Sequence, residues 1–76
     1  IKEMFAVKGC LRTAGNINYQ SEVMDFDSTL VERLQKAGAI PVCTTNVPEL
    51  GLWFETDNVI YGRTNNPFDL KRTAGG

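Results

Sequence analysis

Residues 27–48 have the sequence DSTLVERLQKAGAIPVCTTNVP, and this stretch decides the fold that the chain predicts. It opens with Asp27 followed by Ser-Thr, short side chains that can accept hydrogen bonds from the free N–H groups of a first helical turn. Gly38 suits the left-handed conformation that closes many helices. We therefore predict a helix between Asp27 and Gly38 with a buried apolar face. That face consists of Leu30, Val31, Leu34 and Ala37.

A short apolar run, Ala39–Cys43, follows the predicted helix. Its length and composition indicate a strand, and the polar residues Thr44–Asn46 come directly after it. Ligands of open α/β sheets usually bind outside the carboxyl ends of the strands. The sequence therefore predicts a helix-to-strand unit that places a polar turn at a candidate binding edge.

Ile1–Val7 is a second apolar run that predicts a strand, with Lys2 on the same face as Met4 and Ala6. A lysine on an apolar face loses hydration, which favours the neutral amine that a general base needs. The same pattern is also typical of a lysine at a strand end whose ammonium group reaches water. Periodicity alone favours this second interpretation.

The remaining segments are shorter or more polar. Cys10–Ser21 has the composition of a loop, Val47–Leu50 fits a short helix with proline in its first turn, and Asp69–Gly76 is predicted to be a polar loop. The apolar cluster Gly51–Phe54 either fills the core or lines an apolar pocket. The residues predict part of an α/β protein, a single unit over 1–76, in the order strand, loop, helix, strand, short helix, loop.

The composition excludes several classes of function. A net charge of −1 offers no basic surface for nucleic acid, and no apolar run approaches the roughly 20 residues of a membrane span. Without histidine the chain cannot assemble a Ser-His-Asp arrangement, and it contains no motif for a metal or cofactor. The two cysteines, Cys10 and Cys43, are predicted to be free thiols in a reducing compartment.

The chain begins inside a predicted strand, without an initiating methionine, so we expect it to be a piece of a longer protein. Several short motifs follow one another in a recognisable order. They are Ile1-Lys2-Glu3, the helix and Thr-Asn turn of 27–46, Pro48-Glu49, the series Thr56-Asp57-Asn58, Tyr61-Gly62 and Asn66-Pro67, and the final Gly75-Gly76. In this order and spacing they resemble the amidase signature family of serine hydrolases over nearly the whole chain.

This resemblance implies a fold and a mechanism. The fold would be a mixed sheet flanked by helices, of which this chain forms the N-terminal part. The mechanism would use two serines and a lysine, with Lys2 as the base that draws a proton from the nucleophilic serine through a bridging serine. Both serines and the glycine-rich oxyanion loop would lie beyond Gly76. The hydroxyls of Ser21, Ser28 and Thr45 are not expected to replace them.

Within the family, Thr45–Glu49 and the pair Trp53-Phe54 are most similar to the fatty-acid amide hydrolase branch, particularly its second mammalian type. By position, that resemblance places Gly51, Leu52 and Phe54 on the wall of an acyl channel. It implies a small-molecule amide substrate with a fatty acyl chain and an intracellular enzyme. It also allows a homodimer, and membrane association through parts outside this chain.

Two alternatives remain. One is a glutamyl-tRNA amidotransferase subunit, in which the same chemistry frees ammonia within a complex. Val47–Leu50 stands where a Met-Asp-Glu-Phe type of run is expected there, and Thr44 replaces a lysine common before Thr-Asn, so both positions disfavour it. Ala74 replaces a common proline, which changes little. The other alternative is a non-catalytic structural or binding module on the same fold, which could retain Lys2.

Overall fold

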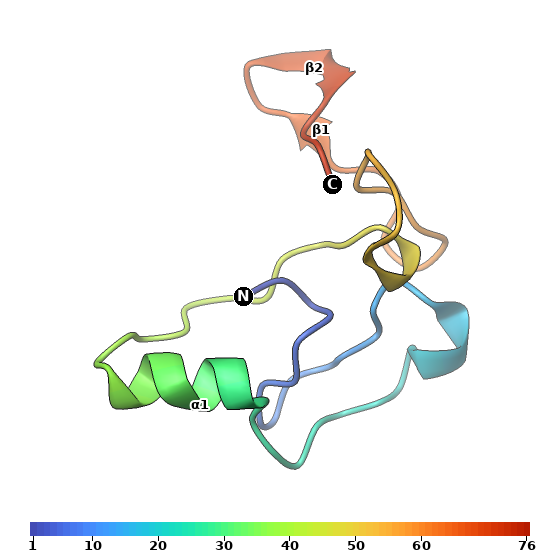
Figure 1. Ribbon diagram of the computed structural model, residues 1–76. Coiled ribbons are helices and arrows are strands. Elements are labelled where there is room, and N and C mark those ends of the chain that lie inside the picture. Colours follow the sequence, from blue (N-terminus) through green and yellow to red (C-terminus); the bar gives the residue numbers. More distant parts are fainter.

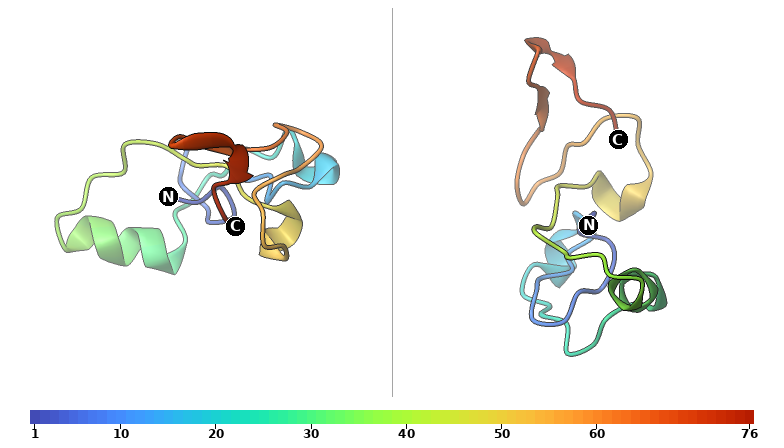
Figure 2. Two further views of the ribbon diagram at one scale, coloured as in Figure 1. Left: turned by 90° about the horizontal axis from the view of Figure 1, so that it is seen from above. Right: turned by 90° about the vertical axis from the view of Figure 1, so that its left-hand side faces the viewer.

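The computed structural model describes residues 1–76 and contains few regular elements (Figure 1). In chain order they are a 3-10 turn at Ile17–Tyr19, helix α1 at Thr29–Lys36, a second 3-10 turn at Glu49–Gly51, and strands β1 at Asn65–Asn66 and β2 at Asp69–Thr73. Figure 2 shows the β1–β2 hairpin at the opposite end of the molecule from α1. One helix and a two-stranded antiparallel sheet are compatible with part of an α/β fold.

Helix α1 lies within the predicted range and ends as the sequence predicts. Gly38 has φ +97°, its N–H donates to the Gln35 carbonyl at 2.9 Å, and the Ala39 N–H donates to the Leu34 carbonyl at 2.9 Å. This pair of bonds is the Schellman motif, and it satisfies two carbonyl groups of the last turn. The predicted side-chain cap at the start is wrong, because the Ser28 hydroxyl makes no capping bond.

The predicted burial of the helix face holds for one residue of α1. Val31 is fully buried, whereas Leu30 and Leu34 are 45% and 42% exposed. The apolar core of the chain is correspondingly small and consists of Ala6, Val7, Met24, Val31 and Val47. Too little chain lies over α1 to cover a face of several large side chains.

Neither of the two predicted strands forms. Ile1–Val7 meets the later segment at a single parallel bridge, Lys2 to Thr45, and then turns, with the Phe5 N–H donating to the Lys2 carbonyl at 3.0 Å. Ala39–Cys43 is extended but exposed, with Val42 88% accessible. A buried strand of a parallel sheet requires paired neighbours and cover on both faces. This chain supplies only the Lys2–Thr45 bridge and one bond from the N-terminal amine to the Cys43 carbonyl.

The predicted loop over Cys10–Ser21 is partly ordered by pairing. Leu11 and Val23 form an antiparallel bridge, and the Arg12 N–H donates to the Glu22 carbonyl at 3.0 Å. The pairing folds the segment back on itself around the Ile17–Tyr19 turn, and it fully buries Thr13. An exposed polar loop is therefore the wrong description of Thr13.

The C-terminal residues also differ from the prediction, because Asp69–Thr73 is strand β2 rather than a loop. It pairs with β1 in antiparallel register, with Asn65 opposite Thr73, Asn66 opposite Asp69 and an irregularity between them. The Asn66 side chain holds the turn, since its Oδ1 accepts from the Phe68 N–H at 2.9 Å and its Nδ2 donates to the Thr73 carbonyl at 3.3 Å. A few local hydrogen bonds thus form a hairpin that no hydrophobic pattern in the sequence indicates.

Candidate functional site

Lys2 is held against the polar turn that follows Ala39–Cys43. The Thr45 N–H donates to the Ile1 carbonyl at 2.8 Å, and the Glu3 N–H donates to the Thr45 carbonyl at 2.9 Å. The peptide groups on both sides of Lys2 are therefore bound to one residue, and the Lys2 side chain is half-buried. Its ammonium group takes part in none of the four ion pairs of the chain. The structure thus brings the predicted base and the predicted polar turn together.

The residue after Lys2 forms a buried polar centre that the sequence pattern does not predict. Glu3 is 6% exposed. Its Oε2 accepts a 2.5 Å hydrogen bond from Thr13 Oγ1, and its Oε1 accepts a 2.7 Å hydrogen bond from the Tyr61 hydroxyl. Thr13 Oγ1 also accepts from the Gly15 N–H at 3.1 Å. Apart from its place beside Lys2, no feature of the local sequence distinguishes this glutamate.

The Glu3 carboxylate alters the acidity of its phenolic partner. The hydrogen bond to Glu3 raises the pKa of Tyr61 above its ordinary value of 10.0, because the bond stabilises the protonated phenol, and burial and the negative charge of Glu3 act in the same direction. Tyr61 therefore remains a hydrogen-bond donor at neutral pH. This contact joins the Lys2 segment to the loop before β1.

Two asparagines organise that loop. Asn46 donates to the Gly62 carbonyl at 3.1 Å and to Thr64 Oγ1 at 2.9 Å. Asn58 donates to Asn46 Oδ1 at 2.7 Å and to the Val47 carbonyl at 2.8 Å, while its own Oδ1 accepts from the backbone N–H groups of residues 60 and 61. The loop that carries Tyr61 is thus tied to the turn that contacts Lys2.

The predicted substrate-binding residues, Gly51, Leu52 and Phe54, lie at the end of the Glu49–Gly51 turn and just after it. Gly51 has φ +72°, and a Cβ at this position would lie 3.1 Å from the Met4 Cε, so the glycine leaves space for Met4. Leu52 and Phe54 are 77% and 86% exposed, and the Trp53 and Phe54 rings are 5.8 Å apart at 54°. The cluster is not part of the core, and the structure does not gather Leu52 and Phe54 around a cavity.

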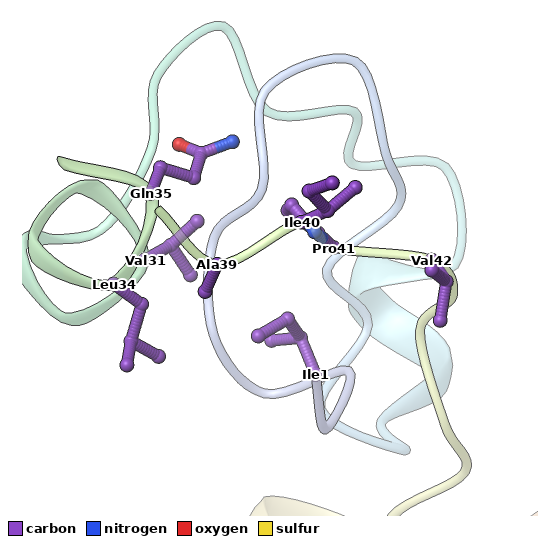
Figure 3. Close-up of a pocket in the computed structure, with 8 residues that line it drawn as sticks. All are labelled: Ile1, Val31, Leu34, Gln35, Ala39, Ile40, Pro41 and Val42. Atoms are coloured by element: carbon purple, nitrogen blue, oxygen red, sulfur yellow. The ribbon is translucent and has the colours of Figure 1, made fainter. Parts of the chain in front are cut away.

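Two small cavities lie along the exposed segment 39–44. The first has a volume of about 140 Å³ and is mostly apolar (Figure 3). It is lined by Ile1, Val31, Leu34, Gln35, Ala39, Ile40, Pro41 and Val42. The second, of about 130 Å³, is lined in part by both Cys10 and Cys43, which are free thiols as predicted. Neither cavity includes Lys2 or the predicted acyl-channel residues.

The family of the chain follows from a comparison with known protein families. A family model described as Amidase matches residues 1–76, which is the whole chain. The chain belongs to the amidase family. The resemblance that the short motifs predict is thereby confirmed.

Three relatives show which proteins this amidase chain is similar to. Fatty-acid amide hydrolase 2 of Homo sapiens is 43% identical over 76 residues, which is 100% of this chain and 14% of the human protein. Fatty acid amide hydrolase 1 of Caenorhabditis elegans is 41% identical over the same 76 residues, 13% of its length. A glutamyl-tRNA(Gln) amidotransferase subunit of Anaeromyxobacter dehalogenans is 38% identical over 76 residues, 15% of its length.

The amidase chain therefore spans about one seventh of the length of the relatives that it matches. None of its helices combines the length and the hydrophobicity that crossing a membrane requires.

Proposed function

We propose that this amidase chain is part of a longer amide hydrolase in which Lys2 is the general base. The observation that carries the proposal is the family match over all 76 residues, which includes the lysine-bearing segment. The extensive apolar exposure of the chain supports a longer protein, since Ile40, Val42 and Phe68 are each more than 80% accessible. Apolar surface of this kind is usually covered by further protein.

In the proposed mechanism, Lys2 in its neutral form accepts a proton that passes from the nucleophilic serine through a bridging serine. The same lysine then helps to return a proton to the departing amine, so one residue serves as base and as acid in successive steps. Both serines belong to protein outside this chain. What this chain contributes is the position of Lys2, whose flanking peptide groups are bound to Thr45.

For the substrate, we propose an amide with a fatty acyl chain. Relatives named fatty-acid amide hydrolase are 43% and 41% identical to the chain over its full length. Leu52 and Phe54 offer exposed apolar side chains just after the Thr-Asn turn, and Gly51, which contacts the Met4 side chain, directly precedes Leu52. We propose these three residues as the chain's contribution to the acyl channel, in an intracellular enzyme.

A second candidate is an amidotransferase component that releases ammonia for use within a complex. It is favoured by relatives named as glutamyl-tRNA(Gln) amidotransferase subunits, which are 38% identical over the whole chain. The two candidates share the base and differ in the substrate. A long-chain primary fatty amide, compared with glutamine, therefore distinguishes them.

The experiment uses the full-length protein that carries this chain, with Lys2→Ala as the test and Lys8→Ala as the matched control, because Lys8 is exposed and forms no ion pair within the chain. Loss of a general base should lower kcat for the fatty amide by about 10²–10⁴-fold. Lys8→Ala should retain the wild-type rate. A Lys2→Ala rate within about threefold of wild type would exclude Lys2 as the base. Hydrolysis of glutamine but not of the fatty amide would favour the amidotransferase.

A further inference from the structure

The chain buries a carboxylate immediately beside its proposed catalytic lysine. Glu3 is 6% exposed and pairs with no lysine or arginine, because the four ion pairs of the chain use other carboxylates. Burying a carboxylate is costly unless hydrogen bonds replace its hydration. Here two hydroxyl groups do so, Thr13 Oγ1 on one oxygen and the Tyr61 hydroxyl on the other. A glutamate held in this way has a geometric role to perform.

Both main-chain polar groups of Glu3 are also hydrogen-bonded. Its N–H donates to the Thr45 carbonyl at 2.9 Å, and its carbonyl accepts from the Ala14 N–H at 3.3 Å. Together with the two side-chain bonds, these contacts connect Glu3 to three separate parts of the chain, at residues 13–14, 45 and 61. A shift of the Glu3 backbone would therefore disturb contacts with residues of all three parts.

We propose that Glu3 is a positioning residue for Lys2, and that Thr13 and Tyr61 hold it in place. This inference rests on the proposed role of Lys2 as the base. A lysine amine lies at the end of a flexible four-carbon stem, so holding the backbone from which the stem leaves limits the positions that the amine can reach. Glu3 holds that backbone on the C-terminal side of Lys2. A base must lie within hydrogen-bond reach of the proton it abstracts, and a misplacement of about 1 Å can cost about 100-fold in rate.

Because Glu3 contacts two hydroxyl groups, a substitution can test its geometric role apart from the effect of its charge. Both of its partners are hydroxyl groups, whose hydrogens rotate, so each can donate or accept. A glutamine in place of Glu3 can accept from one hydroxyl and donate to the other, and it keeps the shape while it removes the charge. Glu3→Gln should therefore retain the position of Lys2, whereas Glu3→Ala should lose it.

The test measures kcat and KM for a long-chain primary fatty amide in the full-length protein. Glu3→Ala should lower kcat by about 10–100-fold and leave KM within about twofold, since the loss arises from misplacement of the base. Glu3→Gln should retain kcat within about threefold of wild type. The matched control is Glu32→Ala, which removes an exposed glutamate of α1 and should leave both constants unchanged.

A double-mutant cycle with Lys2→Ala shows whether Glu3 acts through the lysine. In the Lys2→Ala background, Glu3→Ala should lower the residual rate by less than about twofold, because there is no longer a base to position. If Glu3→Ala does not fold, Tyr61→Phe removes one of the two hydroxyl bonds. It should lower kcat by about 3–10-fold with the same dependence on Lys2.

Three results would overturn the inference while Lys2→Ala remains inactive. They are a wild-type kcat for Glu3→Ala, a Glu3→Gln variant as impaired as Glu3→Ala, and an undiminished further loss in the Lys2→Ala background. An active Lys2→Ala variant is a different failure. It overturns the proposed base and, with it, the positioning role of Glu3.

Discussion

The Tyr61 hydroxyl donates a 2.7 Å hydrogen bond to Glu3 Oε1, so residues 58 positions apart in the chain share one partly buried polar contact. The bond fastens the loop before β1 to the segment that carries Lys2. It also requires the phenol to keep its proton, because a phenolate could not donate and would face a carboxylate of the same charge. The stability of the contact therefore depends on pH.

This dependence predicts a loss of stability in alkaline solution. The folded chain raises the pKa of Tyr61 above 10.0, whereas the unfolded chain does not. The stabilisation is therefore fully present below about pH 10 and is lost as the pH rises through the raised pKa of the folded state.

Urea unfolding between about pH 8 and pH 11 should show this decline in wild type and in the control variant Tyr19→Phe. Tyr61→Phe should be less stable at neutral pH by about 1 kcal/mol and should show a smaller decline. An identical pH profile for Tyr61→Phe and wild type would contradict this assignment.

Asn58 uses all its hydrogen-bonding capacity, and this predicts a large effect of a small change. Asn58→Asp replaces an amide that donates to Asn46 Oδ1 and to the Val47 carbonyl with an oxygen that can donate to neither. We expect a loss of about 2–4 kcal/mol in the free energy of unfolding, since two acceptors lose the Asn58 donor and face a negative charge. The matched control, Asn18→Asp, alters an exposed side chain and should cost less than about 0.5 kcal/mol. Equal stabilities of the two variants would show that the Asn58 network does not hold the loop.

Alanine substitutions at Gly9 and Gly15 distinguish the cost of backbone strain from the cost of steric overlap. Both glycines have positive φ, +82° and +69°, but a Cβ on Gly15 would lie 2.9 Å from the Val47 carbonyl oxygen, whereas one on Gly9 would meet nothing within 4 Å. Gly9→Ala should therefore cost about 1–2 kcal/mol, the usual cost of the left-handed conformation. Gly15→Ala should cost about 1–3 kcal/mol more, because the backbone near Val47 must move. Thermal unfolding of both variants measures the difference, and similar melting temperatures would mean that the two segments are not in close contact.

The elements that could be predicted from the sequence are those that local interactions determine. Helix α1 and its closing glycine depend on residues within two turns of each other, and both lie where the pattern indicates. The strands over 1–7 and 39–43 require neighbours that this chain does not provide, so hydrophobic periodicity alone predicts them wrongly. Strand β2 was missed for the opposite reason, since the side chain of Asn66 closes a hairpin that no apolar pattern marks.

The candidate site, too, could be predicted from the sequence only in part. The order of short motifs singles out Lys2 and the Thr-Asn turn as separate motifs, and the Lys2–Thr45 bridge shows that the two are neighbours. The burial of Glu3 could not be predicted, because alternation along a regular strand says nothing of a chain that turns after Lys2. Its two partners, Thr13 and Tyr61, lie in segments whose sequences indicate only loops.

The proposed acyl channel gives a prediction about substrate length. Leu52 is 77% exposed in this chain, so a charged side chain there disturbs little of the chain's own packing. Leu52→Arg in the full-length protein should therefore lower kcat/KM for a long-chain amide by more than about tenfold, because each buried methylene of the substrate contributes about 0.8 kcal/mol and a guanidinium group would be desolvated beside it. The kcat/KM for a short-chain amide, which does not reach the channel, should fall by less than about threefold.

The matched control is Val59→Arg, at a residue that is 79% exposed and outside the proposed channel. It should leave the ratio of the two kcat/KM values unchanged. Equal losses for both amides in Leu52→Arg would place Leu52 against protein rather than against substrate.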